Sequence, residues 1–403
     1  MACFRYLSTS LFLLTVLWEA SAQDCQINPF QENAPLLVHP ENTTIIYPDH
    51  GNKYITLKAG QSVKFACPQS RVNLGGDKSI PNQVTAVCVS DTQFKVNGAT
   101  ADWNSVSCDS EPVPTGRLSS SSCAKNARLG DIGFPLGADE FLKIITICFD
   151  TVQQTALYSY YDLTRAIGSR GKSPRRPQFA EDRAFYKLNG RTVNQLYLRK
   201  TQRKTVNELL GLDDYDTRYI KNGELYFLAR GHLTAYADFI YPALQKATCR
   251  YINAAPQWQT FNGYNWERAE SDTRNFADSR NVDLKVWTGT YGVTTLPSEE
   301  TDEDIKLYLY SSGSERGIPV PAIYWKLVYE PITKRAIVLI GVNNPYETEF
   351  SKYVICPDVS RNVDWLDWRA TDLKDGYSYA CTLSTFRKVV TYAPNLQVTG
   401  LLE

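Results

Sequence analysis

The sequence has no net charge and no long apolar segment beyond its first residues. Its 43 Lys and Arg residues balance 43 Asp and Glu residues. No field of the whole protein therefore attracts a polyanion, and such a partner needs a local basic patch. After residue 22, no stretch approaches the roughly 20 apolar residues that a membrane span requires. We expect a soluble protein with no membrane partner once the first residues are removed.

Several motifs of hydrolases and metal sites are missing. Neither G-x-S-x-G nor H-E-x-x-H occurs in the chain, so the sequence does not support a serine hydrolase or a zincin. There is no C-x-x-C pair and no His close to a group of cysteines, which argues against a structural zinc site.

Residues 1–22 have the pattern of a secretory leader. Arg5 precedes the apolar run Leu11–Trp18, and Ala20-Ser21-Ala22 forms a small-residue cleavage site. The sequence therefore predicts a secreted, extracellular protein. The N-x-[ST] sequence at Asn42 predicts a glycosylation site near the new N-terminus.

Nine cysteines follow the leader, and most should pair in an oxidising compartment. Proximity in sequence favours Cys356 with Cys381 and Cys123 with Cys148. The odd count leaves one thiol over, which we predict to be Cys249, buried and free. The other four allow three pairings that the sequence cannot rank: Cys25, Cys67, Cys88 and Cys108.

Two regions differ in pattern along the chain. Residues 23–120 alternate short strand-like runs with turn residues and hold four cysteines, which predicts a small disulfide-stapled β module that ends in a linker. Residues 121–403 mix strand and helix signals without a βα alternation, which predicts an α+β domain with an antiparallel sheet. The expected elements are strands at Tyr54–Leu57, Ser62–Ala66 and Val84–Val89, a linker at Ser110–Ser122, a helix at Asn265–Ala277 and a hairpin of Ile323–Tyr329 with Ala336–Val342.

Positive charge is concentrated in the second region. From Arg165 to Lys204 there are twelve Lys or Arg residues and two acids, a local net charge of +10. A charge run is usually a solvated face. Four aromatic rings interleave with these cations and favour phosphate contact with base stacking instead: Phe179, Phe185, Tyr186 and Tyr197.

Histidine scarcity narrows the search for an acid or base. The chain has three: His39 and His50 in the N-terminal region, and His232. His is the side chain whose ordinary pKa suits both roles near neutrality, although a lone His is more often structural. The surroundings of His232 decide between these readings.

Spaced polar residues accompany His232. Arg230 lies two residues before it, Asn253 21 residues after it, Asn262 30 residues after it, and Glu270 eight residues beyond Asn262. This arrangement resembles the DNA/RNA non-specific endonuclease family, which has the ββα-metal fold. The resemblance covers roughly residues 125–400. The sequences of two segments are similar to those of the arthropod branch of secreted and salivary nucleases: Ala229–Leu233 and Ala255–Asn262.

The resemblance implies a role for each spaced residue. His232 would take a proton from the attacking water. Asn262 would be the direct protein ligand of Mg²⁺, with Mn²⁺ as an alternative, and Glu270 would orient water near the metal. Asn253 would hydrogen-bond near the site. Arg230 would lie on the same strand face as His232 and grip phosphate.

A further phosphate contact is implied by Arg176-Pro177-Gln178-Phe179, with Arg176 as the choice and Arg175 as the reserve. Simpler roles stand beside these: Asn262 could cap the following helix, and Glu270 could pair with Arg274 at i+4. The chain also departs from arthropod relatives at Tyr236, where many carry Lys, so a cation near the substrate path is expected to be missing.

The sequence thus predicts a secreted, Mg²⁺-dependent endonuclease that hydrolyses DNA and RNA and contacts the backbone instead of the bases. A small β module would precede the ββα-metal nuclease domain. Two other hypotheses remain: a secreted nucleic-acid-binding protein with little or no turnover, and an adhesion protein with a degenerate nuclease body. A homodimer follows by analogy only.

Overall fold

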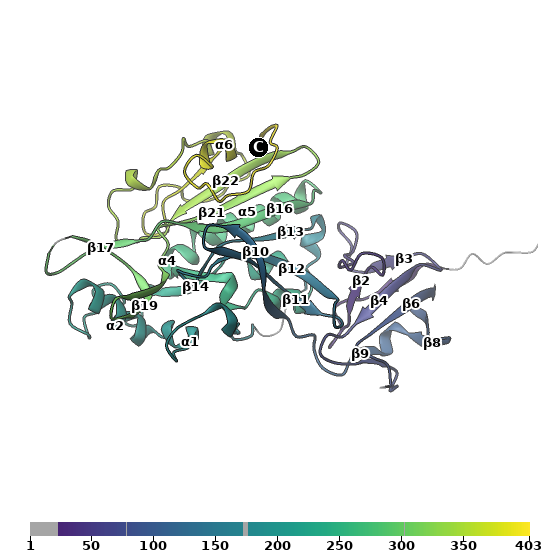
Figure 1. Ribbon diagram of the computed structural model, residues 1–403. Helices are drawn as coiled ribbons and strands as arrows, with labels where there is room; N and C mark the ends of the chain where they lie inside the picture. Colours follow the sequence, from purple (N-terminus) through teal and green to yellow (C-terminus); the bar gives the residue numbers. More distant parts are fainter. Residues whose placement is uncertain (1–22, 78, 172–175, 302) are drawn as a thin grey trace, which may run out of the picture.

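The computed structural model describes residues 23–77, 79–171, 176–301 and 303–403 (Figure 1). The predicted leader, residues 1–22, and Arg175 lie outside the described residues. In the described part of the chain, every helix is too short or too polar to cross a bilayer.

An antiparallel sheet forms the N-terminal module, which lies beside the larger body in Figure 1. Alternation explains it: in β4, Val63 and Phe65 are buried while Ser62 and Lys64 are partly exposed. The three strands expected here are confirmed. The sheet order is β2 (Leu36–Val38), β4 (Ser62–Ala66), β6 (Gln83–Ser90), β7 (Gln93–Val96) and β8 (Ala99–Asp102), with the short pairs β1 (Cys25–Ile27) with β3 (Ile55–Leu57) and β5 (Val72–Leu74) with β9 (Val106–Cys108).

The expected linker at Ser110–Ser122 is wrong over most of its length. Thr115–Ala124 forms β10, which pairs with β11 (Ala127–Pro135) at the edge of the large sheet. Serine-rich segments are typical of loops, but an edge strand needs only one partner for its backbone groups, and its small polar side chains can face water. The connection between the module and the body is therefore shorter than the sequence predicts.

The large sheet is antiparallel apart from the parallel pair β22–β24. Its order is β10, β11, β12 (Phe141–Asp150), β13 (Thr155–Leu163), β16 (Leu284–Tyr291), β21 (Ile323–Glu330), β22 (Arg335–Val342) and β23 (Ser378–Cys381), with β24 (Gly400–Leu401) also on β22. The expected hairpin is confirmed as β21–β22. These findings bear out the predicted α+β fold.

Both faces of this sheet are buried, as β21 demonstrates. Tyr324 and Val328 pack in the same core as helix α5 (Asn265–Ser279), whereas Trp325 and Leu327 pack in a second core with the C-terminal segment. Successive side chains of a strand point to opposite faces, so a strand covered on both sides is apolar nearly throughout. The expected helix at Asn265–Ala277 is confirmed as α5.

A separate pair of strands, joined by a connection that contains α3 (Pro242–Ala247), leads into two helices. β14 (Leu228–His232) pairs antiparallel with β15 (Ala254–Trp258), which leads into α4 (Gln259–Asn262) and then α5. This is the ββα arrangement that the resemblance predicts. The remaining elements are α1 (Val193–Leu196), α2 (Arg199–Leu210), α6 (Leu383–Phe386) and the pairs β17 (Thr295–Pro297) with β18 (Asp304–Lys306) and β19 (Tyr308–Ser312) with β20 (Glu315–Pro319).

Disulfides staple both parts of the chain. The predicted pairs Cys123–Cys148 and Cys356–Cys381 are confirmed, and Cys249 is the free, buried thiol among the described residues. The module contains the two other pairs, Cys25–Cys88 and Cys67–Cys108. The pairing therefore respects the division into module and body.

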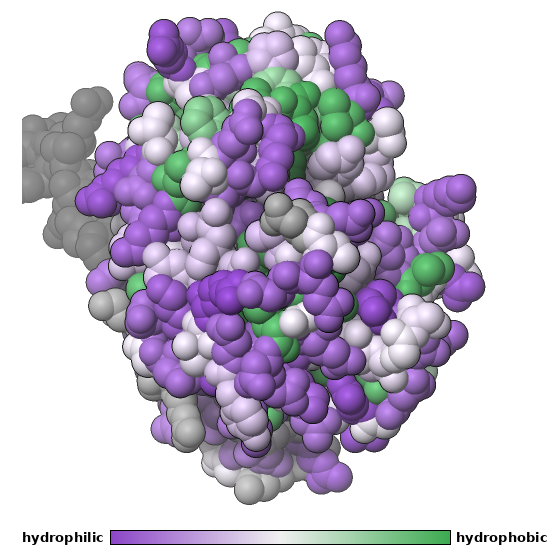
Figure 2. Space-filling view, turned by 90° about the vertical axis from the view of Figure 1, so that its left-hand side faces the viewer, coloured by the Kyte–Doolittle hydropathy of each residue, from purple (hydrophilic) through white to green (hydrophobic). Residues whose placement is uncertain are grey.

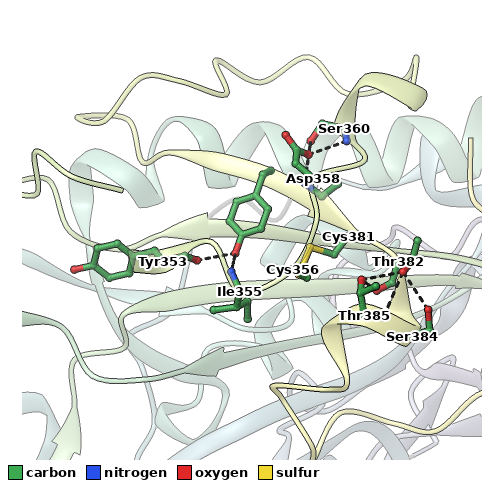
Figure 3. Close-up of a disulfide and its surroundings, with 11 residues drawn as sticks. Tyr353, Ile355, Cys356, Asp358, Ser360, Cys381, Thr382, Ser384 and Thr385 are labelled. Atoms are coloured by element: carbon green, nitrogen blue, oxygen red, sulfur yellow. Dashed lines mark hydrogen bonds between the residues drawn. A yellow bond between two sulfur atoms is a disulfide. The ribbon is translucent and has the colours of Figure 1, made fainter. Parts of the chain in front are cut away.

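The Cys356–Cys381 bond fixes a long loop against the outer strand β23 (Figure 3). Beside it, the hydroxyl of Tyr379 donates to the carbonyl of Tyr353 at 2.7 Å and accepts from the N–H of Ile355 at 3.1 Å. The disulfide and the tyrosine therefore hold the loop at neighbouring points.

The module is docked on the body through Glu140, which precedes β12. Its carboxylate accepts from Lys64 at 2.6 Å, from Thr43 at 2.9 Å and from Gln83 at 3.0 Å. These three donors belong to the module, so one carboxylate ties three of its segments to the body.

We predict that Glu140→Ala lowers the free energy of unfolding by about 1–3 kcal/mol, because it leaves the half-buried ammonium of Lys64 without its partner. Urea unfolding of the full chain measures this. Glu41→Ala, at an exposed position of the module, is the matched control and should change stability by less than about 0.5 kcal/mol. Equal effects of the two substitutions would contradict the docking role.

Candidate active site

Strand β14 presents Arg230 and His232 on one face, because side chains two residues apart share a strand face. Gly231, between them, lies against Gln257 of β15. A Cβ at Gly231 would stand 2.2 Å from the Gln257 side-chain oxygen, so the close approach of the two strands requires glycine here.

His232 is partly buried between an aromatic ring and a thiol. The ring of Phe179 lies 4.9 Å from its imidazole, and Cys249 Sγ lies 3.9 Å from Nε2. Burial, and then the nearby charge of Arg176, lower the pKa of His232 from 6.5 to about 3, against a smaller opposing effect of Asp238. The imidazole is therefore neutral near pH 7 and able to accept a proton.

The charge of Arg176 acts on the imidazole of His232, as described above. Its guanidinium is stacked 4.6 Å from the ring centre of Tyr236. Tyr236 is the position at which the sequence led us to expect a missing cation. The structure supplies a cation there from another segment, because the aromatic ring acts as a platform for Arg176.

Arg230 is held by groups from three segments. Its Nε donates to the hydroxyl of Tyr251 at 3.0 Å and its Nη2 donates to Oδ1 of Asn194 at 2.9 Å. The rings of Tyr197, Tyr251 and Phe179 surround the guanidinium at 5.2–5.9 Å. Asn194 gave no signal in the sequence, because it lies 36 residues from Arg230 and belongs to no motif.

Asn253 is fully buried, and its amide is satisfied inside the protein. Its Oδ1 accepts from the N–H of Thr234, and its Nδ2 donates to the carbonyls of Thr234 and Thr248, all at 2.9–3.0 Å. Asn253 therefore holds the chain that follows His232 against the segment that contains Cys249. Its position suits a scaffold residue beside the site, not a group that touches substrate.

Asn262 and Glu270 do not take the simpler roles that the sequence left open. The N-cap position of α5 is Tyr264, without a side-chain cap. Arg274 pairs with Asp238 at 2.8 Å instead of with Glu270. The simpler interpretations of both residues are therefore excluded.

Asn262 and Glu270 each have side-chain oxygens that no described residue occupies. Nδ2 of Asn262 donates to Gln259 at 3.2 Å, which turns its Oδ1 away from that contact. In the described part of the chain, the Glu270 carboxylate accepts no hydrogen bond although it is only partly exposed. An amide oxygen and an unshared carboxylate are donors that suit a hard divalent cation. The residues present therefore fit such an ion. No group of three or more His, Cys, Asp or Glu residues with metal-binding geometry occurs among the described residues.

Buried charged side chains act on the carboxyl of Glu270. Burial raises the pKa of Glu270 to about 7, while the ammonium of Lys326 opposes the shift. Lys326 is itself fully buried and donates to Thr288 at 2.8 Å. Sequence reasoning missed Lys326 and Asp238 because each sits in an element that reads as apolar core or loop.

The basic segment from Arg165 to Lys204 is not one continuous patch. Arg165 pairs with Asp283, Lys204 pairs with Asp214, and Arg199 and Arg203 donate to backbone carbonyls. Six cations remain exposed and form no ion pair with the described residues: Arg170, Arg176, Arg183, Lys187, Arg191 and Lys200. The side of the molecule on which α2 lies is mostly hydrophilic (Figure 2).

The aromatic part of that expectation needs correction. Phe185 and Tyr197 are buried in the cores, because each packs against neighbouring rings. Tyr186 is half-buried against Phe149 at 5.5 Å. Phe179 is thus the partly exposed ring beside His232, and stacking of bases along the whole segment is not supported.

We predict that the neutral His232 makes stability depend on pH. The unfolded chain binds a proton at this position near pH 6.5, whereas the folded chain binds it near pH 3. Its contribution is therefore complete above pH 6.5 and is lost as the pH falls toward 3. Urea unfolding between about pH 7 and about pH 4 should show that His232→Gln loses less stability than the wild type. Parallel curves for the two proteins would contradict the depressed pKa.

Comparison with known proteins agrees with this geometry. The chain matches the sequence profile of the DNA/RNA non-specific endonucleases over residues 125–386. A salivary endonuclease of Lutzomyia longipalpis is 30% identical over 380 residues, which cover 91% of this chain and 84% of that protein. The salivary protein Tsal1 of Glossina morsitans morsitans is 25% identical over 283 residues, which cover 68% of this chain and 66% of that protein.

A solved structure of an EndoG/EndoGI complex covers 50% of this chain and 72% of its own, with 17% identity and a TM-score of 0.30, a likeness too low to support an argument. The family profile and the salivary relatives identify the family without it. Together with the strand–strand–helix unit that carries His232 and Asn262, they show that the chain belongs to the DNA/RNA non-specific endonuclease family.

Proposed function

We propose that the protein is a secreted, Mg²⁺-dependent endonuclease that hydrolyses phosphodiester bonds in both DNA and RNA. One observation carries the proposal: a neutral imidazole lies on the same strand face as one arginine and is influenced by the charge of a second, in a chain of this nuclease family. Such a group can take a proton from water next to a phosphate that the arginines hold.

His232 is the general base in this proposal. The low pKa of its imidazole keeps it unprotonated at neutral pH, so it can accept the proton of a water molecule that attacks phosphorus. The P–O bond to the leaving sugar oxygen then breaks. Family resemblance implies that the phosphate stays on the 5′ side. Arg176 and Arg230 hold the phosphate through charged hydrogen bonds.

Asn262 and Glu270 would provide the site for the cation. Asn262 would bind it through Oδ1, and the Glu270 carboxylate would orient water beside it. When bound, the cation would neutralise charge on the phosphate and stabilise the leaving oxygen. Mn²⁺ has the same preference for oxygen and is the alternative ion.

The substrate is held by its backbone in this proposal. The exposed cations of residues 176–200 can neutralise phosphates of any sequence. Disulfides in the module and the body support secretion. Asn42 is exposed in a turn near the start of the described chain, which supports its glycosylation. We also propose that the module and the nuclease domain divide the chain near residue 120, with the short connection described above.

We predict that the purified full-length protein degrades plasmid DNA and RNA in Mg²⁺ and that EDTA stops the reaction. Agarose gels measure the degradation, and a gel shift of the same duplex in EDTA measures binding. Binding should weaken as salt rises, because phosphate contacts release counterions. A salt-sensitive shift without degradation in Mg²⁺ or Mn²⁺ would favour a nucleic-acid-binding protein that has lost turnover.

We predict that His232→Ala lowers the cleavage rate by about 10²–10⁴-fold, the range for loss of a general base, and leaves the gel shift in EDTA nearly unchanged. His39→Ala, a partly exposed position of the module whose contacts are made by its backbone, is the matched control. Cleavage at the wild-type rate by His232→Ala would show that His232 is not the general base.

Asn262→Ala tests the cation site separately. We predict that this substitution raises the Mg²⁺ concentration needed for half-maximal cleavage by more than about tenfold, since even groups behind a metal ligand contribute that much. Titration of Mg²⁺ against the initial rate measures the shift. An unchanged titration curve would show that Asn262 does not bind the ion.

A further inference from the structure

The guanidinium of Arg230 has one of its two hydrogen-bonding edges occupied by the protein. Nε donates to the Tyr251 hydroxyl at 3.0 Å, and Nη2 donates to Asn194 Oδ1 at 2.9 Å. These two nitrogens form the side-on edge of the fork. The end-on edge, formed by Nη1 and the second N–H of Nη2, meets no acceptor among the residues that the structure describes, so it can serve another acceptor.

The two acceptors are themselves joined. The hydroxyl of Tyr251 donates to Asn194 Oδ1 at 2.9 Å, so Arg230, Tyr251 and Asn194 form a closed ring of three hydrogen bonds. The hydroxyl uses its proton toward Asn194 and its lone pair toward Arg230. Each member of the ring therefore restricts the other two.

Three aromatic rings surround the guanidinium. The ring centres of Tyr197 and Tyr251 lie 5.2 Å and 5.7 Å from Arg230 Cζ, and these two rings stack on each other with an interplanar angle of 22°. Phe179 lies 5.9 Å from Cζ and also contacts the imidazole of His232. These three rings and Asn194 form a cage around the Arg230 guanidinium. Through Phe179, this cage adjoins His232, the proposed base.

The backbone on each side of the cage is anchored. Asn194 lies on α1, whose first turn is closed by a capping box between Thr192 and Gln195. Tyr251 follows Arg250, which forms a buried ion pair with Asp182. The acceptors are therefore held in place before any substrate arrives, which lowers the entropic cost of using Arg230.

From these contacts we propose that Asn194 and Tyr251 are positioning residues that turn the free Nη1–Nη2 edge of Arg230 toward a substrate phosphate beside His232. The inference rests on the proposed function, because it assumes that Arg230 touches phosphate. It adds a division of the guanidinium into an edge that the protein holds and an edge that the substrate uses.

A double-mutant cycle on the full-length protein tests this. The variants are Asn194→Ala, Tyr251→Phe, Arg230→Ala and Asn194→Ala combined with Arg230→Ala. Affinity for one duplex is measured in EDTA, and kcat and KM are measured in Mg²⁺. Asn222→Ala is the matched control, since Asn222 accepts from Arg203 on α2 in the same manner but outside the cage. Asn194 is exposed and Tyr251→Phe keeps the ring, so both variants should fold, and thermal unfolding checks this.

We expect Asn194→Ala and Tyr251→Phe each to weaken affinity or kcat/KM by about tenfold, the effect of one hydrogen bond to a charged group, and Asn222→Ala to behave as wild type. In the Arg230→Ala background, Asn194→Ala should add less than about twofold, because its effect acts through the arginine. Independent, multiplying effects would overturn the positioning role while leaving the nuclease proposal intact. If the wild type binds but does not cleave, the cycle in affinity still decides the inference. If the wild type neither binds nor cleaves, both proposals fall.

Discussion

The side-chain amide of Asn253 ties together the two segments from which the candidate site is built. It bonds the backbone of Thr234 on one side and that of Thr248 on the other. The first segment continues β14 and fixes the exit of the chain after His232. The second leads to Cys249 and Tyr251, which contact His232 and Arg230. A buried amide with all its groups satisfied specifies one arrangement, since any shift would leave a polar atom unpaired.

Burial then separates the ionisation of the two proposed catalytic side chains. It lowers the pKa of His232 and raises that of Glu270, because in each case it disfavours the charged form. Arg176 adds to the effect on the imidazole, and Lys326 works against the effect on the carboxyl. A cation bound near Glu270 would favour its carboxylate in the same way as Lys326 does. The imidazole is thus neutral at neutral pH, and the carboxyl of Glu270 responds to nearby positive charge.

Local patterns predicted much of this molecule, and contacts between distant segments account for the rest. The alternation in β4, the hairpin β21–β22 and the period of α5 are short-range signals, and the structure agrees with them. Spacing within one stretch of chain also identified Arg230 and His232 as neighbours. Thr115–Ala124 was misassigned because its composition favours a loop, while its strand depends on β11 and β12 behind it. The roles of Arg199 and Arg203 depend on which carbonyls of a later loop face them. The residues around Arg199 and Arg203 contain no pattern that predicts these contacts.

The buried thiol of Cys249 places a constraint on how the chain matures. It is 2% exposed and lies beside the imidazole of His232, in a protein whose other described cysteines are paired. A thiol that stays exposed during oxidation can attack existing disulfides and exchange partners with them. Burial of Cys249 by the strands and helices around His232 removes this thiol from such exchange. Burial of this one thiol and the fidelity of the disulfides are thus linked in the folding of this chain.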